Sequence, residues 1–347
     1  MFGIPLNIIF AIATAFLITL LAIPKIIFFA KRFRLYDSAG ERSAHEGEVP
    51  IFGGIAIFVG IVFSLLFWAE IEQIQFIIVS MFVVFFIGVV DDLLALSPTK
   101  KLIGQIIAIL IIIYLHQLQI DNMHGVLGVF VLSEVIATLF TVFVVIVITN
   151  GFNLIDGVDG LAASLGIVAS FVFGVLALFS QQIDMAILAF TLLGSLLGFL
   201  IHNNYPAKIF MGDTGSLVVG LLLSILAINV VNSGLVFDNM TLPNKGPLVA
   251  IAILSVLLFD SLRVFVVRVF RGRNPLSPDK NHIHHELLNL GFGHLKTTLI
   301  ICLMNMILML IAYFLVDMNI NFAITIFAAI NFILLYIPFL IKKMGDD

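Results

Sequence analysis

The segment NGFNLIDGVDGL, Asn150–Leu161, places two Asn and two Asp between apolar stretches at 129–149 and 160–180. Because a carboxylate at the centre of a bilayer is costly, Asp156 and Asp159 must lie at a membrane edge or line a wet cavity. The Gly that follows each Asp allows a tight turn and a close approach of the backbone to a ligand. A single Asp-Gly step would favour a polar turn between helices. Two steps preceded by two Asn favour a ligand or metal site, with calcium the weaker alternative because the spacing does not fit an EF-hand loop.

The whole chain shares the apolar character of these flanks. Of its 347 residues, 61% are hydrophobic and 11% are charged, and the mean hydropathy is +1.20. These values lie outside the range of soluble domains. The single cysteine, Cys302, cannot form an internal disulfide. The first apolar segment has no basic residue before it and no small-residue cleavage site after it, so we expect it to be retained as a membrane span.

Apolar runs of about 20 residues are typical of transmembrane helices. Eleven such runs lie at 4–24, 51–69, 74–90, 102–118, 129–149, 160–180, 184–202, 215–232, 247–267, 297–316 and 319–341. Only Asp317 and two Asn separate the last two. The sequence therefore predicts an all-α polytopic membrane protein with about eleven transmembrane helices, forming a single domain over 1–347.

Lys and Arg fall in alternate loops between these runs. Of the 17 basic residues, only Lys245 lies on the opposite side. The positive-inside rule then places the N-terminus outside and the C-terminus in the cytoplasm. The polar motifs fall on the same cytoplasmic side, in the loops 31–50, 91–101, 150–159, 202–214 and 268–296. Since scattered solvated charges would not sort in this way, we infer one active surface at the cytoplasmic face.

Asp91 and Asp92 follow the apolar run MFVVFFIGVV. Adjacent carboxylates repel, and near lipid they are tolerated when a cation shares their charge, for which a divalent metal with oxygen ligands is the usual solution. The alternative is a helix-end charge pair solvated at the headgroups. The nearby Lys100, Lys101 and Gln105 favour the site.

The segment FMGDTGSL, Phe210–Leu217, precedes the eighth run. The backbone N–H groups and dipole of a helix start form a seat for an anion. Because Asp213 is itself an anion, Mg²⁺ between it and a diphosphate would reconcile the two charges. The alternative, helix capping by Asp213 or Thr214, is compatible with a ligand role.

The segment PDKNHIHHELL, 278–288, contains three His beside basic residues. Three His suggest zinc, but the lack of Cys and the nearby Arg273 suit phosphate better. Imidazoles near phosphate act as hydrogen-bond donors or as acid and base groups. His202 and His294 are expected to be ordinary interfacial residues.

Taken together, these motifs resemble a known family. DD at 91–92, NxxNxxDGxDGL at 150–161, NxxPAKxFMGDTGSL at 203–217 and PDKxHIHHxLL at 278–288 look like those of the polyprenyl-phosphate N-acetylhexosamine-1-phosphate transferases. The first loop agrees through Asp37, Arg42 and His45. It departs from the family pattern at Ser43 and at Ala39-Gly40, which weakens any role assigned to position 43.

The resemblance implies transfer of a sugar 1-phosphate from a UDP-N-acetylhexosamine to undecaprenyl phosphate, with release of UMP, in the bacterial inner (cytoplasmic) membrane. The HIHH form resembles the branch that initiates teichoic-acid and O-antigen synthesis, which implies N-acetylglucosamine 1-phosphate. The alternative is the phospho-N-acetylmuramoyl-pentapeptide transferase of peptidoglycan synthesis. A homodimer is an open alternative to a monomer, and no nucleic-acid partner is expected.

The resemblance also implies the roles of individual residues. Asp92 and Asp213 would hold Mg²⁺, with Mn²⁺ as the alternative, and Asp91 would deprotonate or orient the lipid phosphate; a covalent phospho-aspartate route is the rival. The residues implied in catalysis are Asp91, Asp92, Asp156, Asp159, His282 and His284. Those implied in substrate binding are Asp37, Arg42, His45, Lys100, Lys101, Asn150, Asn153, Asn203, Phe210, Arg271, Arg273 and His285.

Functions without chemistry fit the sequence less well. A secondary transporter predicts polar groups near the bilayer midplane and an internal repeat. A metal-ion channel predicts acidic residues inside the spans and on both faces. The centres of the apolar runs are almost free of charge, no motif recurs, and the acidic motifs gather on one face. A structural scaffold would need no such clustering.

Overall fold

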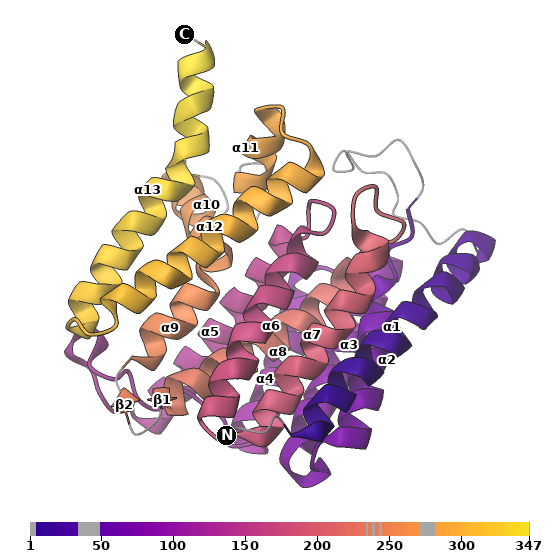
Figure 1. Cartoon of the computed structure of the whole chain (residues 1–347), viewed down its shortest axis with the longest axis horizontal. Helices are drawn as coiled ribbons and strands as arrows, with labels where there is room; N and C mark the ends of the chain where they lie inside the picture. The colour runs from indigo at the N-terminus through magenta and orange to yellow at the C-terminus, as the bar shows by residue number, and fades with distance from the viewer. Residues whose placement is uncertain are drawn as a thin grey trace.

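This computed structural model describes residues 5–33, 49–233, 235–237, 240–242, 245–270, 272 and 282–346, and most of these residues lie in helices (Figure 1). The α-helices are α1 Leu6–Phe33, α2 Gly53–Trp68, α3 Ile71–Leu94, α4 Pro98–Tyr114, α5 Glu134–Ile155, α6 Leu161–Phe179, α7 Ile183–Asn203, α8 Gly212–Ser233, α9 Gly246–Ile253, α10 Ser255–Phe270, α11 Ile283–Asn289, α12 His294–Leu315 and α13 Ile320–Asp346. A 3₁₀ turn, η1, covers Val126–Gly128, and the strands β1 Leu235–Phe237 and β2 Met240–Leu242 form an antiparallel hairpin.

Every predicted apolar run coincides with one helix or with a bent pair of helices. The last two runs are separate helices, as predicted, because α12 ends at Leu315 and α13 begins at Ile320. Among the described residues, eight helices are long and apolar enough to cross a membrane, or nine when α9 and α10 count as one span. Helix α2 has 16 residues and α4 has 17, so their length does not mark them as spans. The polytopic helical membrane architecture is confirmed.

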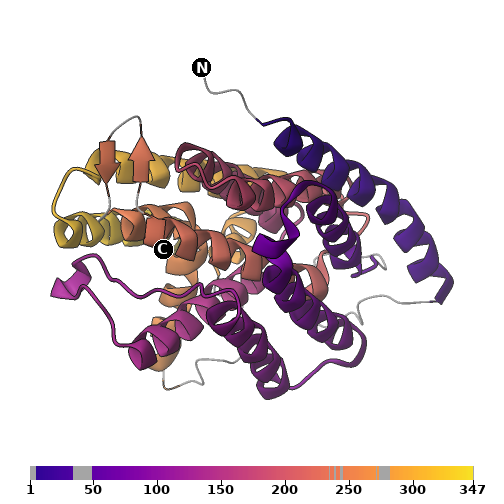
Figure 2. The same cartoon turned by 90° about the horizontal axis from the view of Figure 1, so that it is seen from below.

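Helix α8 lies at the centre of the bundle. It is apolar on all sides, and the 18-residue segment of it that could cross a membrane is completely buried. This is typical of a helix surrounded by other helices. Helices α2, α3, α5, α6, α7 and α9 pack around it. Helix α1 and the pair α12 and α13 lie at opposite edges (Figure 2). The N-terminus of α8, which carries Asp213, is therefore reached from several helices at once.

The polar motifs gather at one end of the bundle. Figure 1 shows α11 and the loops that connect α5 to α6 and α7 to α8 at the end where the C-terminus lies, while the N-terminus and the hairpin lie at the other. This arrangement matches the sorting of motifs that the alternation of loops predicts.

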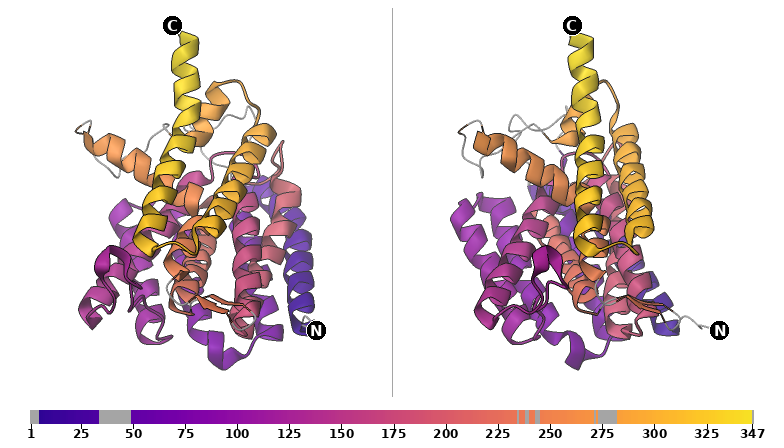
Figure 3. Two further views of the ribbon diagram at one scale, coloured as in Figure 1. Left: turned by 60° about the vertical axis from the view of Figure 1, so that its left-hand side comes forward. Right: turned by 90° about the vertical axis from the view of Figure 1, so that its left-hand side faces the viewer.

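The run at 247–267, predicted as one span, is instead broken. Helices α9 and α10 meet at an angle of 79°, and α10 leaves the bundle sideways (Figure 3). Asn305 of α12 pairs the backbone at the break: its Nδ2 donates to the Ile253 carbonyl at 3.1 Å, and its Oδ1 accepts from the Ser255 hydroxyl at 2.9 Å and from Val256 N–H at 3.3 Å. Unpaired backbone groups are destabilising in an apolar environment, so the hydrogen bonds of Asn305 stabilise the break.

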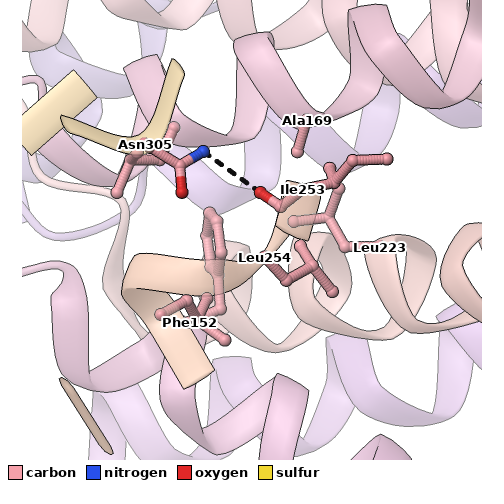
Figure 4. Close-up of a pocket in the computed structure, with 8 residues that line it drawn as sticks. Phe152, Ala169, Leu223, Ile253, Leu254 and Asn305 are labelled. Carbon is pink, nitrogen blue, oxygen red and sulfur yellow. Dashed lines mark hydrogen bonds between the residues drawn. The ribbon is translucent and has the colours of Figure 1, made fainter. Parts of the chain in front are cut away.

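A small cavity lies beside this break (Figure 4). Its lining consists of Phe152, Leu165, Ala169, Leu223, Ile253, Leu254, Leu257 and Asn305. Asn305 is the polar side chain in this set, and its amide is already hydrogen-bonded to the backbone. The cavity is therefore an irregularity of apolar packing at the break, and it lacks the charged groups that a phosphate ligand would need.

Replacement of Asn305 by Leu is expected to destabilise the protein. The change leaves the Ile253 carbonyl and Val256 N–H unpaired, and each buried unpaired group costs about 1–3 kcal/mol. Thermal unfolding in detergent measures the loss. Asn331→Leu is the matched control: Asn331 is completely buried, and within the described part of the chain neither polar atom of its amide has a hydrogen-bond partner. Its replacement should therefore leave the midpoint unchanged or raise it. Equal midpoints for wild type and Asn305→Leu would contradict the assignment.

Candidate active site

The N-terminus of α8 is capped by a carboxylate from another helix. Asp92, in the last turn of α3, accepts hydrogen bonds from the backbone N–H of Asp213 at 2.7 Å and of Thr214 at 3.0 Å, and from the Thr214 hydroxyl. The first N–H groups of a helix have no partner within it, and the helix dipole favours an anion there. The predicted anion seat at the start of α8 is confirmed, and the anion that it holds is the carboxylate of Asp92.

Glycines allow this close contact between helices. A Cβ atom on Gly88 of α3, or on Gly54 of α2, would overlap the backbone of α8. Gly212 has φ +70°, and a Cβ atom there would lie 2.8 Å from Asp92 Oδ2. The lack of side chains at these positions lets the Asp92 carboxylate reach the start of α8.

Lys101, near the start of α4, lies between two carboxylates. Its Nζ is 3.1 Å from Asp91 Oδ2 and also pairs with Asp213 Oδ2. The other oxygen of Asp213 accepts a hydrogen bond from Asn153 Nδ2 at 2.6 Å. Helices α3, α4, α5 and α8 thus supply one cluster, which joins three motifs that are distant in sequence. Lys100 is exposed, so Lys101 is the lysine of this pair that belongs to the cluster.

Asn150 holds α5 against α4. Its Oδ1 accepts a hydrogen bond from Gln105 Nε2 at 3.2 Å, and Gln105 is buried. Gln105 lies four residues after Lys101, on the same face of α4. This amide pair therefore helps to position Lys101, while a contact between Asn150 and substrate stays a prediction.

Asp156 immediately follows the end of α5. Burial, together with the negative charges of Asp213, Asp92 and Asp159, raises the pKa of Asp156 to about 7. A carboxyl in this environment ionises reluctantly because the site already carries excess negative charge. A bound cation would relieve this cost.

Asp159 and Asn203 join the two loops that flank the cluster. Asp159 is buried, and its Oδ2 accepts a hydrogen bond from Ala207 N–H at 3.0 Å. Asn203 is also buried; it accepts from Gly160 N–H at 3.0 Å and donates to the Ile209 carbonyl at 2.9 Å. These contacts position the loops, and direct catalytic or binding roles for the two residues stay predictions.

His294 belongs to the same scaffold, contrary to the expectation of an ordinary interfacial residue. Its Nδ1 accepts a hydrogen bond from Asp159 N–H at 3.3 Å, and the centroid of its ring lies 5.1 Å from that of Tyr205. One turn further along α12, the Thr298 hydroxyl donates to the Asp159 carbonyl at 3.1 Å. The contact joins positions 135 residues apart, and no local pattern in the sequence indicates it.

A buried carboxylate that the motifs do not include supports the histidine segment. Asp260 of α10 is 2% exposed. Its Oδ2 lies 2.8 Å from His282 Nδ1, and its Oδ1 accepts from the Arg263 guanidinium at 2.8 Å and from Ile283 N–H at 3.2 Å. The sequence did carry a signal for this group, namely an acid and a base three residues apart inside an apolar run.

His284 connects the histidine segment to the segment that begins at Asn150. Its ring lies parallel to that of His282, with centroids 5.6 Å apart, and next to that of His285, at 4.2 Å. A Cβ atom on Gly157 would lie 2.7 Å from His284 Nε2, so the imidazole packs directly against the Asp-Gly turn. Burial and the charges of His285 and His282 lower the pKa of His284 to about 3, and this imidazole is neutral at physiological pH.

The segment that contains Phe210 pairs with the end of the first loop. Phe210 N–H donates to the Pro50 carbonyl at 2.8 Å, Gly53 N–H donates to the Phe210 carbonyl at 2.9 Å, and Gly54 N–H donates to the Met211 carbonyl at 2.9 Å. The half-buried Phe210 side chain lies beside the cluster in sequence, and its stacking on a base stays a prediction. The other predicted site residues, Asp37, Arg42, His45, Arg271 and Arg273, lie outside the described residues.

The acidic groups are suited to a hard divalent cation. Asp91, Asp92, Asp156 and Asp213 carry more negative charge than Lys101 neutralises. A carboxylate offers about four acceptor positions; protein donors use three on Asp92 and two on Asp213. Within the described part of the chain, no three His, Cys, Asp or Glu side chains form a ready metal-ligand set. The donors nevertheless fit Mg²⁺, which prefers carboxylate, phosphate and water oxygens to an all-protein cage.

Comparisons with known proteins identify the relatives of this chain. The sequence profile of glycosyl transferase family 4 matches residues 74–231. The chain is 33% identical to the probable undecaprenyl-phosphate N-acetylglucosaminyl 1-phosphate transferase of Bacillus subtilis (strain 168), over 85% of this chain and 82% of that protein. It is 32% identical to the decaprenyl-phosphate N-acetylglucosaminephosphotransferase of Mycolicibacterium smegmatis, over 87% and 80%. The undecaprenyl-phosphate alpha-N-acetylglucosaminyl 1-phosphate transferase of Escherichia coli (strain K12) is 27% identical, over 79% and 74%.

The fold and the site define a class: polytopic membrane proteins with a carboxylate-rich polar site at one end of a helical bundle. Within that class, the chain belongs to glycosyl transferase family 4, among the polyprenyl-phosphate N-acetylhexosamine-1-phosphate transferases that its motifs resemble. The resemblance inferred from the motifs is confirmed.

Asp156→Asn is expected to weaken the dependence of stability on pH. The folded-state pKa of Asp156, about 7, lies above the unfolded value of about 3.9. The folded protein therefore holds this proton more tightly than the unfolded chain does. Ionisation of Asp156 lowers the free energy of unfolding: this loss is absent below about pH 4, grows as the pH rises, and is complete above about pH 7. In metal-free detergent solution, the thermal midpoint of wild type should fall more than that of Asp156→Asn across this interval.

The exposed residue Asp317 provides the control for this measurement. Asp317→Asn should follow the wild-type curve. Parallel curves for wild type and Asp156→Asn would show that burial and neighbouring charges do not act on Asp156 as described.

Proposed function

We propose that the protein transfers N-acetylglucosamine 1-phosphate from its UDP donor to undecaprenyl phosphate, giving a polyprenyl-diphospho-sugar and UMP, and thereby initiates synthesis of a cell-envelope polysaccharide. The relatives from Bacillus, Mycolicibacterium and Escherichia carry names for reactions of this type. One structural observation carries the proposal: Asp91, Lys101, Asn153 and Asp213, from four helices, meet at one end of a membrane bundle.

The position of this cluster suits a lipid acceptor and a soluble donor. A polyprenyl phosphate lies in the bilayer with its phosphate at the boundary, whereas a UDP-sugar arrives from water. In the proposed step, an oxygen of the lipid phosphate attacks the β-phosphorus of the donor, the bond from that phosphorus to the bridging oxygen breaks, and UMP leaves. Phosphoryl transfer of this kind depends chiefly on positioning and on neutralisation of charge.

Different residues at the site serve positioning and charge neutralisation. Lys101 supplies a positive charge that is already held between Asp91 and Asp213. Asp91 either accepts a proton from the lipid phosphate and orients it, or attacks the β-phosphorus of the donor with release of UMP. In the second route, the lipid phosphate then attacks the same phosphorus and displaces the Asp91 carboxylate. Neutral His284, beside Gly157, provides an uncharged hydrogen-bonding group for the donor.

Mg²⁺, with Mn²⁺ as the alternative, would be held by Asp213 and Asp92 with Asp156 nearby, and when bound it supplies positive charge to the diphosphate and the leaving UMP. The excess of carboxylates over ammonium groups supports this assignment. Asp92 would then serve both as helix cap and as ligand.

We assign eleven spans to the protein, with α2 and α4 as the short ones, an external N-terminus and a cytoplasmic C-terminus, in the bacterial inner membrane. The distribution of the 17 basic residues supports this orientation, as does the position of the polar motifs at the end where the C-terminus lies (Figure 1). A homodimer remains an alternative to a monomer.

The test uses the purified protein in lipid nanodiscs. UMP release from UDP-N-acetylglucosamine should require both Mg²⁺ and undecaprenyl phosphate. Parallel reactions with UDP-N-acetylgalactosamine and with UDP-N-acetylmuramoyl-pentapeptide assign the donor from the lipid product. Release of UMP without the lipid, or no release with any donor, would contradict the proposal.

Asp213→Asn should lower kcat by about 100-fold or more, the scale on which one electrostatic contact in a transition state is lost. The Mg²⁺ concentration for half-maximal rate should rise in parallel. Asp184→Asn is the control, because Asp184 lies near the start of α7 and accepts a hydrogen bond from Glu70 N–H at 3.2 Å. A variant at Asp213 with wild-type turnover and metal dependence would exclude it as a ligand.

The neighbouring lysines should differ in effect. Lys101→Gln removes the charge between Asp91 and Asp213 and should lower kcat/KM by about 10-fold or more, as expected for loss of a buried charged hydrogen bond. Lys100→Gln changes an exposed side chain and should retain most of the activity. Steady-state rates of UMP release compare the two, and the reverse order of effects would contradict the placement of Lys101.

A further inference from the structure

We propose that Asp260 is a positioning residue: it holds the imidazole of His282 with a proton on Nδ1 and so keeps Nε2 available to the donor diphosphate. The identity of this ligand rests on the proposed function. The position of the proton is independent of it.

The contacts of Asp260 fit an ionised carboxylate, because the guanidinium of Arg263, which is always charged, lies against its Oδ1. Its Oδ1 accepts from Arg263 Nη2 at 2.8 Å and from Ile283 N–H at 3.2 Å, while its Oδ2 lies 2.8 Å from His282 Nδ1. An ionised carboxylate only accepts hydrogen bonds. His282 Nδ1 must therefore carry the proton in this contact, whether the imidazole is neutral or cationic.

The opposite nitrogen of His282 is unpaired. The residue is 3% exposed, and Nε2 is buried without a hydrogen-bond partner among the residues that the structure describes. Because buried polar atoms in proteins are nearly always paired, such an atom indicates a missing partner. A phosphate oxygen of the donor would be this partner. Because such an oxygen only accepts hydrogen bonds, Nε2 must then carry a proton as well, and Asp260 accepts from Nδ1 of the doubly protonated imidazole.

The orientation of the His282 ring also supports a role at the site. The His282 ring lies parallel to that of His284, with only 4° between their planes. His284 in turn packs against Gly157, between Asp156 and Asp159. The stack therefore connects Asp260 to the acidic turn that borders the cluster.

Asp260 is itself held firmly. Arg263, its partner on the same helix, is 6% exposed, and its guanidinium carbon lies 4.3 Å from the centre of the Phe339 ring on α13. The 79° break between α9 and α10 directs this part of α10 towards α11. Carboxylates that orient a histidine in this way set its tautomer and direction.

The first test reads the tautomer of His282 in the full-length protein. Histidine labelled with ¹⁵N gives eight side chains, and the signal lost in His282→Gln is assigned to His282. Nδ1 should show the shift of a protonated nitrogen in wild type, and this signature should be lost in Asp260→Asn. A wild-type His282 protonated on Nε2 alone would overturn the proposal, and this outcome needs no variant at Asp260 to fold.

The second test is a double-mutant cycle in the UMP-release assay. Asp260→Asn should lower kcat by about 10- to 100-fold, the usual effect of losing a carboxylate that orients a histidine. In the His282→Gln background, the same change should lower kcat by no more than about 2-fold, because Asp260 would act through His282. Additive effects of the two changes would overturn the proposal in favour of a structural role.

Glu286→Gln provides the matched control. Glu286 is also a buried acid at this junction, and its Oε2 pairs with Lys342 Nζ at 3.1 Å; the contacts of its side chain do not include His282. The control should keep both the His282 tautomer and the wild-type kcat. If wild type releases no UMP, the proposed function fails, whereas the tautomer measurement still decides the role of Asp260.

Discussion

The carboxylate of Asp92 at the N-terminus of α8 is the contact on which the site depends. The first N–H groups of a helix have no partner within it, and those of α8 lie against α2 and α3, so another helix supplies the acceptor. Asp92 does so from α3, and the glycines at 54, 88 and 212 give it room. The result places Asp213 within reach of Lys101 and Asn153, and the polar cluster is a consequence of how the central helix is capped.

The same requirement recurs wherever the chain departs from regular helix. Asn305 pairs the backbone at the break between α9 and α10, and Asn203 pairs the turn after Asp159 with the segment before α8. These amides hold loops and helix breaks in fixed positions. Several residues of the family motifs are therefore parts of a scaffold, and this scaffold holds the cluster in which Asp91, Lys101 and Asp213 meet.

The charges of the site are not balanced within the protein, and the pKa values of two side chains reflect this. Asp156 has a raised pKa because it is buried and because other carboxylates surround it, and His284 has a lowered pKa because burial and the neighbouring imidazoles disfavour a positive charge. In the protein without ligand, the burial of these two ionisable groups lowers the stability of the fold. Such an arrangement is expected where a divalent cation and a diphosphate complete the electrostatics.

The sequence by itself determined the membrane class, the eleven apolar runs, the position of every motif and the family, because hydropathy and short motifs are local properties of the chain. It predicted Asp91, Lys101, Asn153 and Asp213 as site residues, and the structure brings these four side chains together. Tertiary structure decided which of them touch: that Asp92 caps α8, that Lys101 and not Lys100 turns inward, that the run at 247–267 breaks, and that Asp260 and His294 join the site. These facts depend on contacts between segments far apart in the chain, and the physical reason is that a buried polar group takes its partner from whichever helix packs beside it.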